Sequence, residues 1–370
     1  MRLKHLAIAG FRNLGALRIE PGSRFNLLYG LNAQGKTNLL EAIYLLGSPR
    51  SFRNARLPEL IRHGERIAQV QGEVESGGVL SRIRVTLEQA GRRVEIDGKG
   101  IQRASDLHGR LNAVVFSPDD TAMVRLGPEA RRRYLDRAVY MGDIGYLHCW
   151  HGYHRILKQR NHLLKSADRS GLDSWTEQLA GAGAEVIERR QRYVALLNVR
   201  LQRHYATISG NGENAGIGYC PEGVQATERA GIRADLLELF ARHGRSDERY
   251  GTTTAGPHRD DLAFCLDERP LKAFGSQGQQ KSFVLALKMA EMDNLQAIFG
   301  EPPLLLLDDM SSELDAARNG NLMEFLSQRN TQVFITTTGR SPALTRAATH
   351  CAVFRVEDGN LTFEGNESHE

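Results

Sequence analysis

The chain has 370 residues, of which 41% are apolar and 25% charged, a composition typical of a globular protein rather than a disordered or fibrous one. No apolar run approaches the roughly 18 residues of a membrane helix, and the first residues lack the cleavage pattern of a signal peptide. Four widely separated cysteines without a C-x-x-C pair favour reduced thiols, so we expect a cytoplasmic protein with no membrane partner.

The net charge of +4 is distributed unevenly along the chain. Residues 126 to 209 contain 14 Lys/Arg and 8 Asp/Glu, which gives this segment a net charge of +6 and leaves −2 for the rest. The middle of the chain is therefore where a polyanion could be bound.

The first 122 residues show strand patterns around one early helix. Residues 24 to 30 are predicted to form a buried strand, and the helix that follows them has one apolar face. Three strand patterns with glycine-rich turns lie between residues 67 and 101, and "AVVFSPDD" adds a strand that its proline stops.

Residues 123 to 249 are predicted to form an inserted, mainly helical lobe. Helical patterns start at Pro128, and an apolar stripe near residues 179 to 197 favours an antiparallel helix hairpin. Residues 209 to 223 are predicted to form a loop, and residues 234 to 244 a short closing helix.

Strand patterns return after residue 250 in "LAFCLD", "PPLLLLDD" and "TQVFITTT". The whole pattern predicts the α/β class: mixed sheets with flanking helices, formed by residues 1–122 plus 250–370, with the helical lobe at 123–249 inserted.

The stretch "GLNAQGKT" matches the phosphate-loop motif G-x-x-x-x-G-K-[ST] and stands between a predicted strand and a predicted helix, as the motif requires. Glycines let backbone N–H groups surround phosphate oxygens, and the helix N-terminus adds positive potential. Lys36 would bind the β- and γ-phosphates, and Thr37 would ligate Mg²⁺. The predicted nucleotide-binding residues are Gly30, Leu31, Asn32, Ala33, Gln34, Gly35, Lys36 and Thr37. The alternative is an incidental glycine-rich turn.

The stretch "LLLLDDMSSELD" supplies the second half of a nucleotide site. Four leucines predict a strand buried on both faces, and Asp308 follows at its carboxyl end, where ligands of open α/β sheets bind. Asp308 would hold Mg²⁺, and Asp309 could orient the attacking water as the catalytic carboxylate beside Lys36. The alternative is an Asp pair that only caps the next helix.

The polar stretch "GSQGQQKS" precedes this motif and "SSELD" follows it, and here the chain resembles the ABC-type ATPases. The resemblance implies an ATPase in which one subunit closes over the ATP of another through a Ser-x-Gly-Gln element. It implies that Ser276, Gly278 and Gln279 contact the γ-phosphate in trans, with the helix from about Lys281 directing its N-terminus there. Ser312 and Asp315 would line the same interface.

Six motifs tighten the match: "GFRNL", "SFRN", "VFSPDD", "GPHRDDL", "SQGQQ" and "DDMSSELD" resemble the RecF family of recombination-repair ATPases, in that family's order from residue 10 to 315. These proteins are related to SMC heads without the long coiled coil. The resemblance implies ATP and Mg²⁺ as cofactors, DNA binding at junctions, a homodimer on ATP binding, RecR and RecO mediators, RecA as an indirect partner, and a nucleoid-associated location.

Three departures from the wider ABC pattern predict slow hydrolysis. Gly275 stands where many ABC ATPases have Leu, and Asp309 stands where they have Glu, so the carboxylate is one methylene shorter. The last core strand ends without a switch His, and Thr337 or Thr338 is the nearest candidate. We therefore expect a weak, DNA-dependent ATPase that acts as a switch rather than a metabolic enzyme.

Basic residues of the helical lobe are candidates for phosphate contacts with DNA, which need cationic donors but carry no sequence information. The candidates are Arg131, Arg132, Arg133, Lys158, Arg160 and Lys165. Charged helix faces are usually only solvated, so this prediction depends on the family resemblance. We expect Arg12 and Arg53 to serve the nucleotide or the core interface instead.

Histidines crowd one predicted helix without a second ligand group at zinc-site spacing, so we expect packed or exposed side chains rather than a metal site. They are His148, His151, His154 and His162, with Cys149 among them. We expect His258 in "GPHRDD" to be a structural or interface residue.

Three other classes compete with this interpretation. The ATPase subunit of an ABC transporter is also soluble, but the helical insert and "GPHRDD" do not fit it. A chromosome-organising head needs a long coiled-coil arm, for which the 127-residue insert is too short. A small-molecule P-loop kinase would leave "SQGQQKS" and "SSELD" without a role.

Overall fold

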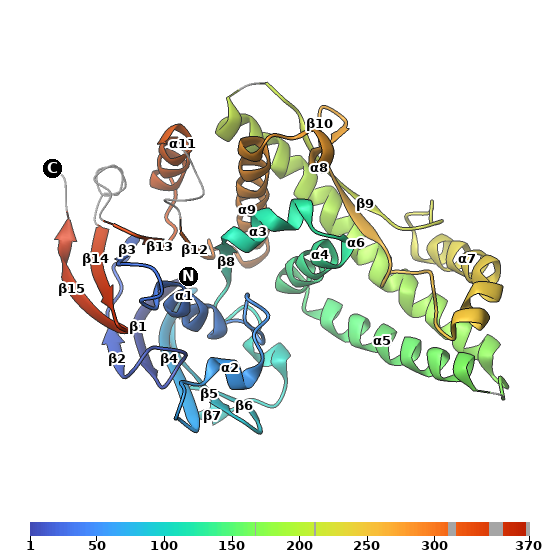
Figure 1. Ribbon diagram of the computed structural model, residues 1–370, viewed down its shortest axis with the longest axis horizontal. Helices are drawn as coiled ribbons and strands as arrows, with labels where there is room; N and C mark the ends of the chain where they lie inside the picture. Colours follow the sequence, from blue (N-terminus) through green and yellow to red (C-terminus); the bar gives the residue numbers. More distant parts are fainter. Residues whose placement is uncertain (167, 211, 310–315, 340–350, 368–370) are drawn as a thin grey trace. The chain divides into compact units, whose positions relative to one another are not determined.

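The computed structural model describes the chain except for residues 167, 211, 310–315, 340–350 and 368–370 (Figure 1). The chain forms two compact units. The first unit comprises Met1–Thr121, Thr207–Gly210 and Gln277–Glu370, and the second comprises Ala122–Ala206 and Asn211–Ser276. The second unit, defined by the contacts within it, extends to Ser276, whereas the predicted helical lobe ends at residue 249. The division into an ATPase domain and an inserted lobe stays a prediction.

The first unit contains a mostly parallel sheet with the strand order β15-β14-β3-β13-β12-β8 among the described residues. The parallel neighbours are β8 (Ala113–Phe116), β12 (Leu304–Leu307), β13 (Val333–Thr337), β3 (Phe25–Tyr29) and β14 (Cys351–Glu357). At the edge, β15 (Asn360–Glu367) pairs antiparallel with β14. The strands β8, β12 and β13 are buried along their whole length, as apolar runs in the middle of a parallel sheet should be.

The described helices of the first unit are α1 (Lys36–Leu45), α2 (Leu57–Leu60), α3 (Pro118–Arg125), which ends in the second unit, α9 (Gln277–Phe299), α11 (Ala316–Ser327) and a short 3-10 turn (Ala104–Leu107). Of these, α1, α3 and α11 directly follow strands of this sheet. Because β13 lies between β3 and β12, the carboxyl ends of these two motif-bearing strands meet at one edge of the sheet.

A second, antiparallel sheet of the first unit has the order β2-β1-β4-β5-β6-β7. Its strands are β1 (Arg2–Ala9), β2 (Leu17–Ile19), β4 (Ile67–Ser76), β5 (Val79–Glu88), β6 (Gly91–Ile96) and β7 (Lys99–Gly100). Alternate side chains of β4 are buried, and α1 contacts both this strand and β13, so one core joins the two sheets (Figure 1). Gly72 makes the close approach possible, because a Cβ there would lie 2.5 Å from a methyl carbon of Leu46.

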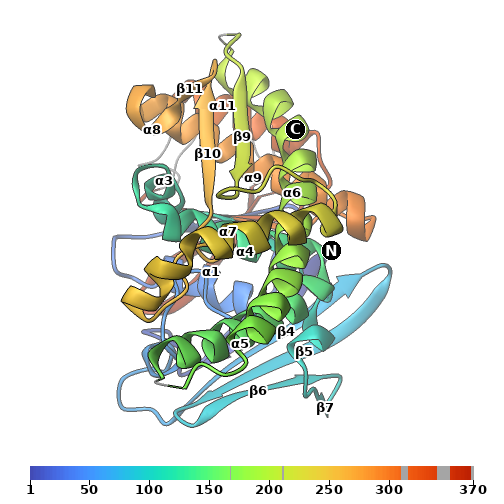
Figure 2. The ribbon, with the colours of Figure 1, turned by 90° about the vertical axis from the view of Figure 1, so that its right-hand side faces the viewer.

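The second unit consists of long helices and a small sheet (Figure 2). Its elements are α4 (Pro128–Gly142), α5 (Ile144–Lys165), α6 (Leu172–Ser209), α7 (Arg229–Tyr250), α8 (Leu271–Phe274), β9 (Ala215–Cys220), β10 (Asp261–Leu266) and β11 (Arg269–Pro270). Arg160 bonds Thr176 and Tyr146 bonds Arg190, so α5 and α6 run antiparallel, which confirms the predicted hairpin.

One sequence prediction in this unit is wrong, and one helix is longer than predicted. The predicted loop at residues 209–223 contains β9, which pairs antiparallel with β10, and Figure 2 shows the two strands side by side. Ala215 and Ile217 are buried by this pairing, which a local pattern of glycines and small residues does not reveal. The predicted short helix at 234–244 is the middle of the longer α7.

Among the helices of the described residues, none combines the length and the apolar character that crossing a membrane requires.

Candidate functional site

The loop that joins β3 to α1 is shaped by residues with special backbone requirements. Gly35 is the N-cap of α1 with φ of 113°, and a Cβ there would lie 2.8 Å from Oδ1 of Asn13. A Cβ on Gly30 would lie 2.2 Å from the carbonyl oxygen of Val356. Ala33, between them, also has positive φ, at 64°. The loop therefore curls tightly into the N-terminus of α1, which is the arrangement that binds phosphate.

The turn between β14 and β15 supports this loop from outside. The amide of Gly359 donates to the carbonyl oxygen of Gln34 at 3.0 Å, and the amide of Asp358 donates to the side-chain oxygen of Gln34. Asn13 Nδ2 donates to the carbonyl of Ala33 at 3.3 Å. These contacts fix the loop, which is a requirement for a preorganised binding site.

Lys36 directs its ammonium group back into the loop. Nζ donates to the carbonyl oxygens of Gly30 at 2.6 Å and Leu31 at 2.7 Å, and the residue is 8% exposed. Burial lowers the pKa of Lys36, and the charges of Asp309 and Asp308 oppose this shift. A cation held at this depth among carbonyl groups is well placed to accept an anionic ligand.

The structure brings Thr37 and Asp308 together. The Thr37 hydroxyl donates to the Asp308 carboxylate, 2.8 Å from Oδ1 and 3.0 Å from Oδ2. Asp308 is 6% exposed, and its amide bonds the carbonyl of Phe116 at 2.8 Å. Burial raises the pKa of Asp308; hydrogen bonds from Thr336 and Thr37 oppose the shift, and the neighbouring charge of Asp309 adds to it. A nearby cation would stabilise this buried carboxylate.

Asp309 has a left-handed backbone, with φ of 51°. Its amide donates to the hydroxyl of Thr336 at 2.8 Å, and the same hydroxyl donates to Oδ1 of Asp308 at 2.8 Å. Thr336 is not among the residues predicted from the sequence. Of the two predicted switch candidates, Thr337 donates to the carbonyl of Gly339 and Thr338 is exposed.

An ion-pair network lies beside α1. Arg12 binds the buried Glu41 through two hydrogen bonds of 2.9 Å, and the Ser51 hydroxyl bonds the same carboxylate. Arg53 Nη1 donates to Oδ1 of Asn38 at 3.1 Å, and its charge opposes the raised pKa of Asp308. Arg12 thus stabilises the core around α1. The side chain of Arg53 is 41% exposed, and its charge acts on Asp308, the candidate metal ligand.

The Ser-x-Gly-Gln segment differs from the prediction in its secondary structure. The helix begins at Gln277 rather than near Lys281, so Gly278 and Gln279 lie in its first turn, and the exposed Ser276 precedes it. Gly275 ends α8, where a Cβ would lie 2.7 Å from the carbonyl of Leu271. Glutamine is a good helix former, so the polar run extends the helix instead of forming a loop. The predicted interface residues Ser312 and Asp315 lie outside the described residues.

Two of the predicted DNA contacts are wrong because their side chains are buried. Arg131 forms two hydrogen bonds with Asp261, at 2.7 and 2.8 Å. Arg160 is 3% exposed and bonds Asp247 and Thr253, each at 2.7 Å. Arginines so deep in a unit stabilise its packing and cannot reach an external phosphate.

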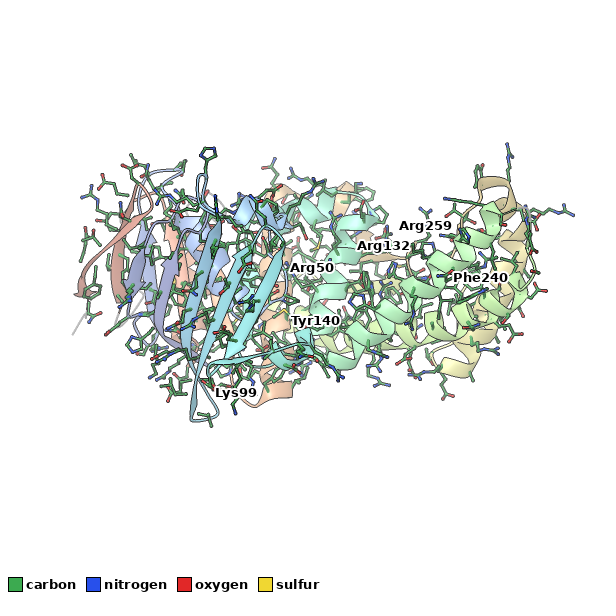
Figure 3. All side chains as sticks on the ribbon, turned by 90° about the horizontal axis from the view of Figure 1, so that it is seen from below. Arg50, Lys99, Arg132, Tyr140, Phe240 and Arg259 are labelled. Carbon is green, nitrogen blue, oxygen red and sulfur yellow. The ribbon has the colours of Figure 1, made fainter. Side chains whose placement is uncertain are left out.

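The remaining candidates are accessible to different degrees. Arg132 is half-buried and donates to the carbonyls of Arg259 and Asp260, and Figure 3 shows it beside Arg259. The exposed members of the set are Arg133, Lys158 and Lys165.

His258 is fixed as a neutral imidazole. Its Nε2 faces the carbonyl oxygen of Thr253 at 3.1 Å and therefore carries the proton, so Nδ1 accepts from the Tyr153 hydroxyl at 2.6 Å. Burial lowers the pKa of His258 to about 4, and Arg259 and His154 add to this, against the hydrogen bond to Thr253. On α5, His154 packs against Trp150 with ring centroids 4.1 Å apart.

The His258 environment predicts acid sensitivity. Between its folded pKa and the unfolded value near 6.5, the unfolded chain binds more protons, so the free energy of unfolding falls as pH falls. Lowering pH from 7 to 5 should cost about 2 kcal/mol through this residue. Urea unfolding of wild type and His258→Gln across this range measures it. Equal pH slopes for the two proteins would contradict the assignment.

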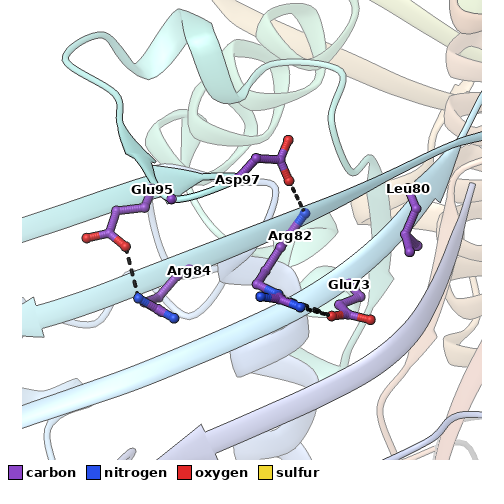
Figure 4. A pocket seen from close by; sticks show the side chains of 7 residues that line it. Glu73, Leu80, Arg82, Arg84, Glu95 and Asp97 are labelled. Atoms are coloured by element: carbon purple, nitrogen blue, oxygen red, sulfur yellow. Dashed lines mark hydrogen bonds and ion pairs between the residues drawn. The ribbon is translucent and has the colours of Figure 1, made fainter.

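A surface pocket on the antiparallel sheet is not a comparable candidate (Figure 4). It lies on β4, β5 and the β6 end, and its charges are paired: Arg82 with Glu73 at 2.7 Å and Arg84 with Glu95 at 3.1 Å. The amide of Arg82 also bonds Asp97. Such paired charges are typical of a solvated sheet face.

Comparison with known proteins finds similarity to one family over almost the whole chain. A family model described as RecF/RecN/SMC N terminal domain matches residues 2–362. The DNA replication and repair protein RecF of Trichlorobacter lovleyi is 53% identical over 99% of each chain. A solved structure of the recombination mediator protein RecF-ATP in the RecFOR pathway is 32% identical, with a TM-score of 0.88, and covers 98% of this chain and 99% of that one. The predicted fold class, an ABC-type ATPase head of the α/β class, is therefore confirmed.

Proposed function

This chain belongs to the RecF family of DNA replication and repair proteins, and from that premise we propose that it is an ATP-dependent DNA-binding protein of recombinational repair. The single observation that carries the proposal is the contact between Thr37 and Asp308, 271 residues apart, beside the buried ammonium of Lys36. This contact would join the two halves of the proposed nucleotide site at one edge of the sheet. ATP would bind along Gly30–Thr37, with its phosphates on the N-terminus of α1.

The residues present fit Mg²⁺. A hydroxyl and a carboxylate supply the hard oxygen ligands that this ion prefers, and the buried Asp308 has a raised pKa that a cation would offset. Thr37 and Asp308 would hold the ion, which when bound neutralises charge on the triphosphate.

Asp309 is the proposed carboxylate of hydrolysis. It would take a proton from the attacking water as the water oxygen bonds the γ-phosphorus and the bond to the bridging oxygen breaks, giving ADP and phosphate. The charge of Asp309 opposes the lowering of the Lys36 pKa by burial, which supports assigning the two groups to one site. The shorter side chain of Asp relative to Glu supports slow turnover, which suits a switch.

A second copy of the chain would complete the site. Ser276 is exposed, and Gly278 and Gln279 lie at the N-terminus of the 23-residue helix α9, where the macrodipole favours an anion. Leu31 in the phosphate loop and Phe274 before Ser276 are large apolar side chains, 74% and 68% exposed. An ATP-driven homodimer would cover both the polar residues at the start of α9 and these exposed apolar side chains.

The dimer would grip DNA, at gaps or at junctions of single and double strands, and help RecO and RecR mediators load a recombinase. If only the dimer binds DNA tightly, ATP must strengthen both association and DNA binding, since the two equilibria are linked. Phosphate contacts from exposed basic side chains such as Arg133, Lys158 and Lys165 would make that affinity fall with salt.

The substitution Ser276→Arg tests the proposal. It places a bulky cation at the proposed dimer contact, so ATP binding should stay near wild type while ATP-driven dimerisation and DNA binding are lost. Sedimentation and a DNA titration with and without ATP measure both. Ser23→Arg, at an exposed serine of the first unit, is the matched control. If wild type shows no ATP effect on mass or DNA affinity, or if Ser276→Arg retains it, the proposal is wrong.

A further inference from the structure

Thr336 occupies a position between the two motif-bearing strands. It lies on β13, opposite Leu28 of β3, and the residue before it, Ile335, is opposite Leu307 of β12. Thr336 is fully buried, at 0% exposure. Its hydroxyl is thus a polar group inside the sheet, directly beside the carboxylate of Asp308 and the backbone amide of Asp309.

The hydroxyl joins both carboxylate residues. It donates to Oδ1 of Asp308 at 2.8 Å and accepts from the amide of Asp309 at 2.8 Å. The orientation is chemically fixed, because a carboxylate oxygen can only accept and an amide N–H can only donate. The Thr336 hydroxyl therefore donates its proton to Asp308 and accepts a hydrogen bond from the next residue, Asp309.

The second of these bonds restrains an unfavourable backbone. Asp309 has φ of 51°, a left-handed conformation that non-glycine residues adopt rarely and that the surroundings must hold. The bond to Thr336 fixes the peptide group on the N-terminal side of Asp309. The direction in which its carboxylate leaves the backbone depends on that peptide.

We propose that Thr336 is a positioning residue that sets the orientation of Asp309 and ties it to Asp308. This inference rests on the proposed function, because Thr336 would orient the carboxylate that the proposed function assigns to ATP hydrolysis. A buried hydroxyl with a purely structural role could satisfy its hydrogen-bonding capacity with any nearby backbone group. The Thr336 hydroxyl instead bonds the two residues proposed to bind the metal and to activate water.

Three variants test the proposal. Thr336→Val keeps the shape of the side chain but removes the hydroxyl, and Thr336→Ser keeps the hydroxyl. The matched control is Thr331→Val, because Thr331 is also buried and precedes the same strand, and its hydroxyl has no hydrogen-bond partner among the described residues.

The first readout is independent of turnover. Hydrogen exchange at the Asp309 amide, followed on peptides that end on either side of it, should be faster by about 10-fold or more in Thr336→Val, since the acceptor is lost. Thr336→Ser and Thr331→Val should exchange as wild type. Unchanged exchange in Thr336→Val would overturn the proposal.

The second readout separates chemistry from binding. For Thr336→Val we expect kcat for ATP hydrolysis to fall by about 10- to 100-fold, the usual effect of losing a group that orients a ligand or catalytic residue, with ATP affinity within about 3-fold of wild type. Thr336→Ser should restore kcat. Equal losses in the Val and Ser variants would assign the effect to packing and overturn the proposal. A wild-type protein without turnover would refute the proposed hydrolysis, and the exchange result would still decide the role of Thr336.

Discussion

Lys36→Ala is expected to remove ATP-dependent behaviour from the protein. The ammonium group is the buried cation of the phosphate loop, already bound to the carbonyls of Gly30 and Leu31. Without it, the anionic ligand loses its charge-assisted contact, and turnover should fall at least about 100-fold, the effect of removing one preorganised donor. ATP turnover and fluorescent-nucleotide binding measure the loss.

Lys99→Ala is the matched control for this change. Lys99 is an exposed lysine on β7 of the antiparallel sheet, labelled in Figure 3, and it contributes nothing to the phosphate loop. The control should bind and hydrolyse ATP as wild type. Normal nucleotide binding by Lys36→Ala would show that ATP binds elsewhere.

Asp309→Asn is expected to stop hydrolysis while leaving binding intact. The amide side chain cannot take a proton from water, and general-base catalysis is worth about 100- to 10,000-fold in rate. The ATP-bound dimer should therefore persist, and DNA should remain bound for longer than with wild type. Single-turnover hydrolysis and the rate of dimer disassembly measure the two effects.

The matched control is Asp97→Asn, since Asp97 also has φ of 51° but lies on the surface of the antiparallel sheet. The same backbone conformation and the same chemical change there should leave turnover unaltered. If Asp309→Asn hydrolyses ATP at the wild-type rate, another group is the base.

The halves of the site could be predicted from sequence because each is a local motif. Thr37 lies in the first turn of a helix after one buried strand, and Asp308 directly follows another strand, so their meeting needed only the rule that carboxyl ends of parallel strands share an edge. Thr336 could not be chosen over its neighbouring threonines from sequence. Strand order places β13 between β3 and β12, and the register of the strands then decides which threonine faces Asp308 and Asp309.

The errors in the second unit have a common physical origin in distant partners. The pairing of β9 with β10 joins segments more than forty residues apart, so a glycine-rich stretch becomes a strand. Arg160 appeared to be a basic surface residue, but Asp247, 87 residues away, neutralises it in the interior. Burial of a charge depends on such a partner, and one sequence does not reveal it.

The central claim is that each ATP is enclosed by two copies of the chain, and mixing two inactive variants tests it most directly. Lys36→Ala lacks a working loop but keeps Ser276, whereas Ser276→Arg has the opposite defect. Neither variant is expected to dimerise with itself on ATP binding, whereas a mixed dimer would hold one intact site of two. An equal mixture should therefore regain ATP turnover that both variants lack separately, up to about half of the wild-type rate. Turnover no greater than the mean of the two variants measured separately would contradict the shared site.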